Sequence, residues 1–489
     1  MAPIFSSFAR KIKQVLLFLA PLNTFEIALF LIAIAGSALV YFATLHFNPV
    51  LIKDIDWEFL RLATNLREYG VYADSSDPSA FHLSSGYTPL YPLLLVPFVY
   101  HYTLMLVLNW VLHALIIVFT YRLAIRLGAH AGVSFVACAL FALEPYHLNL
   151  TNQIMSEMLF GLLLLFAVHS ALTYLQEKRF LYLGVASLLL GLSTLTRPSA
   201  EFLIPAILII PFFTLGVSRR AILHGLAGVC ICVLVLLPWL LRNYYFYHAF
   251  SLSSLTTQQL ISAGIPQYLE WKEKGAAATE KSIYERRYAL YREAEKYLGY
   301  HPQKPLELNI VDRIVDFNEA RIINQHMVWP LLKTDGLSMF GFYLTQLPFQ
   351  LMTDNWRTAL DNILHLPYTQ TTSLSAALAA VRGDFSQILT TFKSVDPYLF
   401  AFLAGKIYWL VAYLLGAFGA YVLWRRGGTV RLAAIGLVLL AIYFPLVSLP
   451  YLESRYRFPA TPFIFTLVSI GASVISVWIA QKVQRVRHR

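Results

Sequence analysis

The sequence has 489 residues, of which 58% are hydrophobic and only 13% are charged. A soluble domain could not cover so many apolar side chains with polar surface, so the composition excludes an ordinary soluble protein. The net charge of +11 does not indicate nucleic-acid binding, because the basic residues never gather in one soluble segment. The sequence therefore predicts a polytopic membrane protein.

Apolar segments long enough to cross a bilayer as helices recur along the chain, with polar residues between them. We expect about ten spans, of which the third and the fifth are short. In chain order, the expected spans are residues 24–46, 102–121, 131–143, 157–175, 180–195, 199–216, 221–241, 399–423, 432–450 and 459–480. The predicted fold is therefore an all-α transmembrane helical bundle.

A polar segment divides this series of spans. Between residues 243 and 396 the sequence becomes polar and rich in charge, which predicts an extracytoplasmic, mainly helical domain. We therefore expect a transmembrane catalytic module at 1–242, the inserted domain at 243–396 and a second transmembrane module at 397–489. Within the insertion, residues 335–352 are apolar but interrupted by Gly and Pro, so they either lie flat on the membrane or enter it.

The basic residues are distributed in a way that predicts the topology. They cluster at both ends of the chain and in alternate connections, at residues 10–13, 121–126, 176–179, 218–220, 424–431 and 482–489. Cytoplasmic loops carry an excess of Lys and Arg, so we expect these clusters and both termini to be cytoplasmic. The membrane would be the plasma membrane or, in a bacterium, the inner membrane, and residues 47–101 would form the first outer loop.

The first outer loop places acids ahead of an amphipathic segment, DIDWEFLRLATNLREYG. Its apolar residues at helical spacing are Phe59, Leu60, Ala63 and Leu66. Gly70 is a typical helix stop, so the pattern predicts an amphipathic helix on the membrane surface. Asp54 and Asp56 precede this helix, and the alternative to a chemical role is that one of them only caps it.

Each later outer boundary also contributes ionisable residues. They are Glu157 in NQIMSE, Arg197 and Glu201 in TLTRPSAEF, and Glu453, Arg455 and Arg457 in YLESRYRFP. Charges beside a membrane span are costly, so they usually face a polar cavity and mark a functional site. Arg197 and Glu201 are four residues apart, and the alternative for these two is a local ion pair.

Carboxylates and arginines at the outer membrane surface suit sugar transfer from a lipid-linked donor. A carboxylate can act as general base and take the proton of the incoming hydroxyl. Arginine binds the oxygens of the departing lipid phosphate with two-point geometry and stabilises the charge that develops there. A base on one side and cations on the other predict an in-line displacement with inversion.

The motifs and their order resemble the GT-C class of polyprenyl-phosphate-sugar glycosyltransferases, in the branch of the protein O-mannosyltransferases and the lipid A aminoarabinose transferase. The similar motifs are DIDWEFLRLATNL, GYTPLYPLLL, NQIMSE, TRP at 196–198 and SRYRFPATP, and the resemblance covers residues 46–216 and 397–480. It implies a GT-C-like bundle, a polyprenyl-phosphate-linked sugar as donor, and a protein, lipid or glycan as acceptor.

The resemblance also implies roles for individual residues. Asp56 or Asp54 would be the catalytic base, with Asp56 favoured by its spacing to ATNL, and Glu157 would be a second acid that orients the acceptor or supports the site. The residues implied to bind the lipid phosphate are Arg455, Arg457 and Arg197. No cofactor is firmly predicted, but residues 54–56 form D-x-D, so a divalent cation that bridges the acids stays an alternative.

The alternative function is a polytopic transporter or lipid flippase. Such proteins place ionisable residues near the bilayer midplane and often contain inverted repeats with broken helices. Here the acids and arginines lie at span ends, and the scattered ionisable residues within the spans are His113, His169 and Lys406. The pattern favours the enzyme, with membrane lipids but no nucleic acid among its partners.

Overall fold

A computed structural model describes residues 21–48, 58–75, 81–275, 278–299, 315–364, 397–449 and 454–487. These residues are mostly helical, and an isolated antiparallel bridge between Ala73 and Leu83 is their only extended pairing. Eight of the described helical segments are long and apolar enough to cross a membrane. They are α2 (Thr24–Phe47), α6 (Tyr102–Arg126), α9 (Glu157–Glu177), the η3–α12 segment (Pro198–Leu215), α13 (Arg219–Tyr247), α22 (Pro397–Arg426), α23 (Gly428–Val447) and the α24–α25 segment (Ser454–Arg487). The expectation of an all-α, multi-pass membrane protein is confirmed.

The span expected at 131–143 is one arm of a bent pair of helices. It is α7 (Ala131–Ala142), which meets α8 (Pro145–Thr151) at an angle of 61°. Proline lacks the N–H that would continue α7, and Glu144 caps α8 by accepting the backbone N–H of His147 at 2.7 Å. A buried carboxylate therefore lies at the break between the two arms.

Two other apolar segments also differ from simple spans. The span expected at 180–195 is α10 (Phe180–Thr194), which is shorter than the roughly 20 residues that a membrane helix needs. The apolar residues 335–352 belong to one helix, α18 (Trp329–Met352), which continues through Pro348. α18 is not among the helices that have the length and composition of a span.

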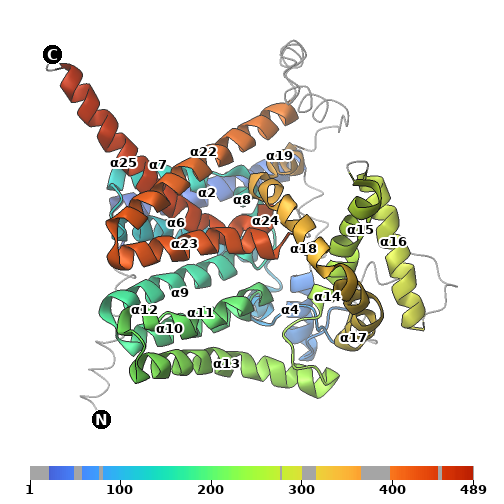
Figure 1. Ribbon diagram of the computed structural model, residues 1–489. Coiled ribbons are helices and arrows are strands. Elements are labelled where there is room, and N and C mark those ends of the chain that lie inside the picture. The colour runs from blue at the N-terminus through green and yellow to red at the C-terminus, as the bar shows by residue number, and fades with distance from the viewer. Residues whose placement is uncertain are drawn as a thin grey trace.

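Helices that are far apart in sequence pack together in the bundle (Figure 1). α25 (Thr461–Arg487) lies against α22, and α10 contacts both α9 and α13. The backbones of α22 and α25 approach closely because Gly419 and Gly471 place no side chain between them. The apolar core thus joins the N-terminal and C-terminal groups of spans into one bundle.

The basic clusters meet at one end of this bundle. Arg122, near the end of α6, forms an ion pair of 2.8 Å with Glu26 in the first turn of α2. One turn later, Arg126 donates to the side chain of Gln176 at the end of α9, at 2.6 Å. At the end of α22, Arg426 donates to the carbonyl oxygen of the residue that follows α6, at 2.7 Å. The helix ends that we expect to be cytoplasmic therefore lie together.

The helix expected in the first loop is present as α4 (Glu58–Tyr69) and ends before Gly70, whose φ is +67°. Its buried residues include Leu62 and Ala63. Asn65, which the helical pattern puts on the polar face, is also buried, because its side-chain amide donates to two carbonyl oxygens of the returning chain, at 2.8 and 2.9 Å. The chain then enters the bundle through α5 (Leu90–Leu95) and η2 (Val96–Phe98).

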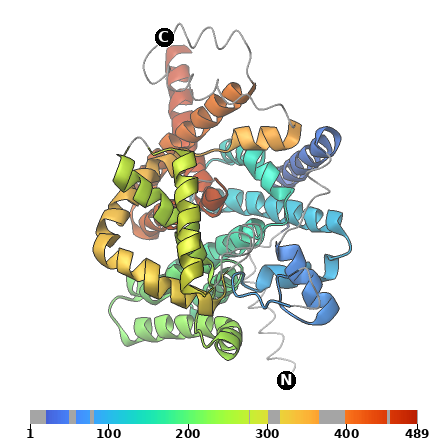
Figure 2. The ribbon, with the colours of Figure 1, turned by 90° about the vertical axis from the view of Figure 1, so that its right-hand side faces the viewer.

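A group of mostly polar helices lies beside the bundle, at the right of Figure 1 and facing the viewer in Figure 2. We call it the appended unit: α14 (Leu255–Gln259), η4 (Leu260–Gly264), α15 (Ile265–Lys274), α16 (Glu280–Tyr297), α17 (Phe317–Ile323), η7 (Asn324–Val328) and α18. It has an apolar core of its own, which includes Tyr268, Tyr291 and Phe342. After α18, the short helix α19 (Trp356–Leu364) returns to the bundle and contacts α2, α8 and α22.

Candidate functional site

Two of the residues expected at the site, Glu157 and Arg197, form an ion pair. Glu157 is the first residue of α9, where the helix N-terminus favours a negative charge. Arg197 lies in the extended turn after α10, a conformation that the following proline favours. Arg197 Nη1 donates to Glu157 Oε1 at 2.5 Å. The pairing of Arg197 with Glu201 is therefore wrong: Arg197 pairs across helices, not within its own turn.

Half of the Glu157 carboxylate has no protein partner among the described residues. Glu157 is 3% exposed, and its Oε2 atom is buried without a hydrogen bond there. A buried acceptor atom left in this state costs free energy, so it is retained more readily where a ligand supplies a donor. The free oxygen suits a role in orienting a hydroxyl.

A second arginine joins the site through Tyr456. Tyr456 and Arg455 belong to α24 (Ser454–Arg457), and Arg455 Nη2 donates to the Tyr456 hydroxyl at 3.0 Å. The Arg455 guanidinium lies 4.8 Å from the centre of the Tyr456 ring, and that of Arg197 lies 5.7 Å from the same centre. Two cations from opposite parts of the sequence thus surround one ring, which is a favourable setting for an anion.

The first loop reaches the same place through two tyrosines of GYTPLYPLLL. The ring of Phe59, in the first turn of α4, lies 4.8 Å from that of Tyr87 and 5.2 Å from that of Tyr91. Burial raises the pKa of Tyr91, and the charge of Glu157 raises it further. Burial likewise raises the pKa of Tyr87, with a smaller increase from Glu58 that the charge of Arg455 opposes. All five motifs of the sequence therefore contribute residues at or beside this site.

The two aspartates expected to supply the base, Asp54 and Asp56, lie outside the described residues, as does Glu453. The described chain resumes at Glu58, the first residue of α4. Glu58 lies close enough to Tyr87 to raise the pKa of that tyrosine, and it is the described acid that follows Asp54 and Asp56 most closely in the sequence. The roles of Asp54 and Asp56 stay predictions.

Arg457 has different neighbours from Arg455, although it is only two residues away. Residues two apart on a helix point about 200° away from each other. Arg457 is fully buried, its guanidinium lies 3.6 Å from the centre of the Trp409 ring, and its Nη1 donates to the Leu351 carbonyl oxygen at the end of α18. Arg457 thus anchors α18 to the bundle.

A second buried polar cluster lies at the break between α7 and α8. Trp356 Nε1 donates to Glu144 Oε1 at 2.6 Å, and Lys406 forms an ion pair of 2.8 Å with Asp354. We call Glu144, His147, Asp354, Trp356 and Lys406 the break cluster. Its contacts join the bent span to α19 and α22, which holds the chain after α18 in place.

Within the described part of the chain, no group of three or more His, Cys, Asp or Glu side chains is arranged to hold a metal ion. The pair at 54–56, for which a divalent cation was the alternative, falls outside that part. No protein-family model matches the chain, and no curated protein matches it significantly.

The sequence pointed to Glu157, Arg197 and Arg455 singly but not to their arrangement. It missed Tyr456, whose ring both arginines contact, and Tyr87 and Tyr91, which pack on Phe59 beside the charged groups. Their signal was adjacency: each tyrosine stands inside a motif already selected for its charged or proline residues. An aromatic residue beside a functional arginine or acid is a natural candidate for packing against it.

Proposed function

We propose that the protein is a membrane glycosyltransferase that moves a sugar from a polyprenyl-phosphate-linked donor to an acceptor hydroxyl at the extracytoplasmic face. The observation that carries this proposal is that Arg197, which is paired with Glu157, shares the ring of Tyr456 with Arg455. Aromatic side chains pack beside these groups, and the basic helix ends meet elsewhere, at one end of the bundle. An acid and two arginines in one place match the needs of glycosyl transfer from a phosphate to a hydroxyl.

In the proposed reaction, the acceptor oxygen attacks the anomeric carbon of the sugar while an aspartate, Asp56 or Asp54, takes its proton. The bond between the anomeric carbon and the phosphate oxygen breaks, and its electron pair stays on the lipid phosphate. Arg197 and Arg455 stabilise that charge, and Glu157 orients the acceptor through its free oxygen. The products are the inverted glycoside and the polyprenyl phosphate.

Arg457 was also predicted to bind the lipid phosphate. Its burial and its contacts with Trp409 and the end of α18 support an anchoring role for it instead. We therefore assign the phosphate to Arg455 and Arg197. A divalent cation bridging Asp54 and Asp56 is not needed for any step of this scheme.

The break cluster favours a second candidate, a lipid or solute transporter. Buried ionisable residues beside a broken helix are typical of transporters, and Glu144 lies at such a break. The acids and bases of this cluster are, however, engaged in local contacts: Glu144 with Trp356, and Asp354 with Lys406. These contacts suit a fixed scaffold better than a moving gate.

The deciding experiment measures sugar transfer by the purified protein in lipid from a panel of polyprenyl-phosphate-sugar donors. Asp56→Asn and Asp54→Asn each remove a candidate base and keep the side-chain shape. The control is Asp335→Asn, which removes an acid of the appended unit that pairs with Lys272. We expect one of the first two to abolish transfer while donor binding and the control stay unchanged. Lipid translocation without transfer by any variant would instead support the transporter.

A further inference from the structure

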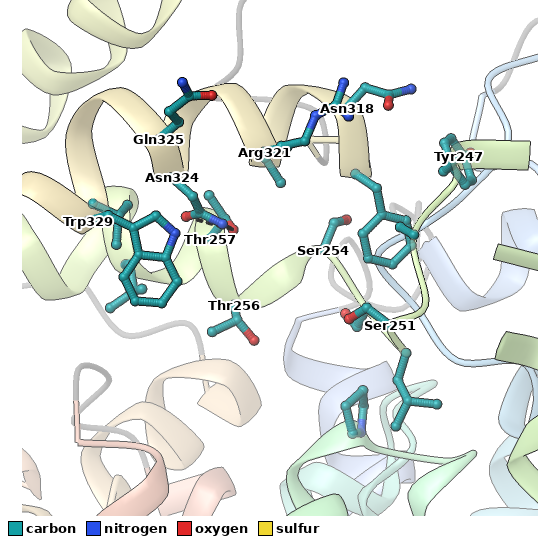
Figure 3. Close-up of a pocket in the computed structure, with 18 of the residues that line it drawn as sticks. Tyr247, Ser251, Ser254, Thr256, Thr257, Asn318, Arg321, Asn324, Gln325 and Trp329 are labelled. Carbon is teal, nitrogen blue, oxygen red and sulfur yellow. Dashed lines mark hydrogen bonds between the residues drawn. The ribbon is translucent and has the colours of Figure 1, made fainter. Parts of the chain in front are cut away.

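A cavity of about 740 Å³ lies between the bundle and the appended unit. Its lining includes Pro198, which directly follows Arg197 in the chain, and Glu201, which lies four residues after Arg197. One wall is the segment from the end of α13 into α14, and the other is the helix that runs through α17, η7 and the start of α18 (Figure 3). The chain therefore passes directly from the ion pair of the candidate site to the lining of the cavity.

The first wall is rich in hydroxyl groups and is fixed to the first loop. Ser251, Thr256 and Thr257 contribute hydroxyls to its lining. Ser254 and Ser85 join their hydroxyls at 2.9 Å, and the backbone N–H of Ser254 donates to the Ser85 carbonyl oxygen at 3.0 Å. The loop that carries Tyr87 is therefore hydrogen-bonded to this wall of the cavity.

The second wall presents a stripe of four side chains, Arg321, Gln325, Trp329 and Lys333, all of which line the cavity. In a regular α-helix, positions twelve residues apart would point about 120° away from each other. The π-helical turn η7 winds less per residue and reduces this drift, which keeps the stripe on one face. Asn324 in that turn is held across the cavity by Thr257, with donor–acceptor distances of 3.0 and 3.2 Å.

The stripe combines the chemistry of sugar recognition with positive charge. Trp329 is 56% exposed and faces the same open space as Thr256 in Figure 3, so its ring is available for stacking. Arg321 and Lys333 line the cavity without an ion-pair partner among the described residues. The acid in the lining is Glu201, and it forms no ion pair with either of them. The lining also includes side-chain amide and hydroxyl groups, which can form hydrogen bonds with a sugar.

We propose that this cavity binds an anionic saccharide, which is the acceptor of the transfer. The sugar rings stack on Trp329 and bond to the hydroxyls of the opposite wall, and a phosphate or carboxylate substituent binds Arg321 and Lys333. A sugar hydroxyl at the end of the cavity lined by Pro198 and Glu201 is then on the side from which the chain leads back to Arg197. The assignment as acceptor rests on the proposed function, whereas the binding site itself does not.

The test measures binding to the full-length protein in lipid nanodiscs. The probes are an oligosaccharide phosphate, an oligouronate and a neutral oligosaccharide of the same length, with inorganic phosphate and an acidic peptide as further probes. We expect at least one anionic saccharide to bind about tenfold more tightly than the neutral one. Whichever of the two anionic saccharides, the phosphate or the uronate, binds more tightly identifies the anionic group that the cavity prefers.

Variants assign the binding to the stripe. Trp329→Ala should weaken the binding of all saccharides by about tenfold. The double variant Arg321→Gln with Lys333→Gln should remove the preference for anionic saccharides over the neutral one. The control is Arg292→Gln with Lys296→Gln, which removes the same charge from exposed positions of α16 outside the cavity. The control should bind as the unmodified protein does.

Three results would overturn the inference: no saccharide binds, the peptide binds in preference to all of them, or the stripe variants bind as the control does. If transfer to another acceptor persists alongside such a result, only the cavity has been misassigned. If the anionic saccharide binds through the stripe but no donor gives transfer, the cavity stands and the glycosyltransferase proposal fails.

Discussion

Arg197 reaches across from the turn after α10 to form an ion pair with Glu157 at the start of α9, with 2.5 Å between Nη1 and Oε1. The carboxylate is 3% exposed and the guanidinium 22% exposed, so the pair lies at the edge of the protein interior. Only one of the carboxylate oxygens is used by the pair, because Oε2 has no hydrogen bond within the described residues. The same pair can therefore hold two helices together and receive a substrate.

A first prediction separates these two roles. Glu157→Gln should lower the rate of transfer by about 100-fold, because the charge that holds Arg197 in place is lost. It should also lower the free energy of unfolding by roughly 2–4 kcal/mol, since it leaves a partly buried cation unpaired. Thermal unfolding and transfer from the lipid-linked donor measure the two effects, with Glu177→Gln at the opposite end of α9 as control.

The double variant Glu157→Leu with Arg197→Met completes this test. Replacing both members of a buried pair with apolar residues often restores stability. We expect thermal stability close to that of the unmodified protein and no transfer. Recovered transfer would mean that the pair serves only to join the helices.

A second prediction contrasts two arginines of one short helix. Arg455→Gln should weaken donor binding at least about tenfold and leave thermal stability nearly unchanged, because Arg455 contacts Tyr456 beside the site. Arg457→Gln should lower the free energy of unfolding by roughly 3 kcal/mol, because it removes a buried group that holds the end of α18. Equal effects of the two changes on donor binding would contradict this division of roles.

A third prediction concerns the contact between α22 and α25. A Cβ atom at Gly419 would overlap the Leu467 carbonyl oxygen, so Gly419→Ala should force the two helices apart. Gly416 lies one turn earlier on α22, where the nearest atom to an added Cβ is 3.8 Å away. Gly416→Ala is therefore the matched control. We expect the first change to lower the thermal unfolding temperature and the second to leave it unchanged.

A fourth prediction is a pH dependence in the appended unit. Hydrogen bonds from Lys274, and then from Arg286, lower the pKa of Glu270 from its ordinary 4.5 to about 2. Because the folded protein holds the carboxylate ionised more strongly, this stabilisation is present above pH 4.5 and is lost as the pH falls towards 2. The protection factors of the α15 and α16 amides, which correct hydrogen exchange for its intrinsic pH dependence, should fall over that range.

Glu270→Gln should remove this dependence and accelerate exchange at neutral pH. The control is Glu273→Gln, since Glu273 also pairs with Arg286 but is 61% exposed and should contribute less. An unchanged pH profile in Glu270→Gln would show that another group governs the stability of the unit.

Much of the helical architecture could be predicted from the sequence, because each span must satisfy its own backbone hydrogen bonds and present an apolar surface. α2, α6 and α9 lie close to where their apolar runs predicted them. The bend at Glu144 was not predicted, since proline indicates a break but not the angle between the two arms. The sequence also could not indicate that Asn65 would be buried by its bonds to the returning chain.

By itself, the sequence determined which residues are costly to place beside a membrane and therefore where to look: Glu157, Arg197 and Arg455. Only the tertiary structure decided their partners. Arg197 had a nearby acid in Glu201 but pairs with Glu157, which is 40 positions away, because helix packing brings the start of α9 next to the end of α10. The same packing sends Arg455 to the site and Arg457 into the bundle, since residues two apart on a helix point in nearly opposite directions.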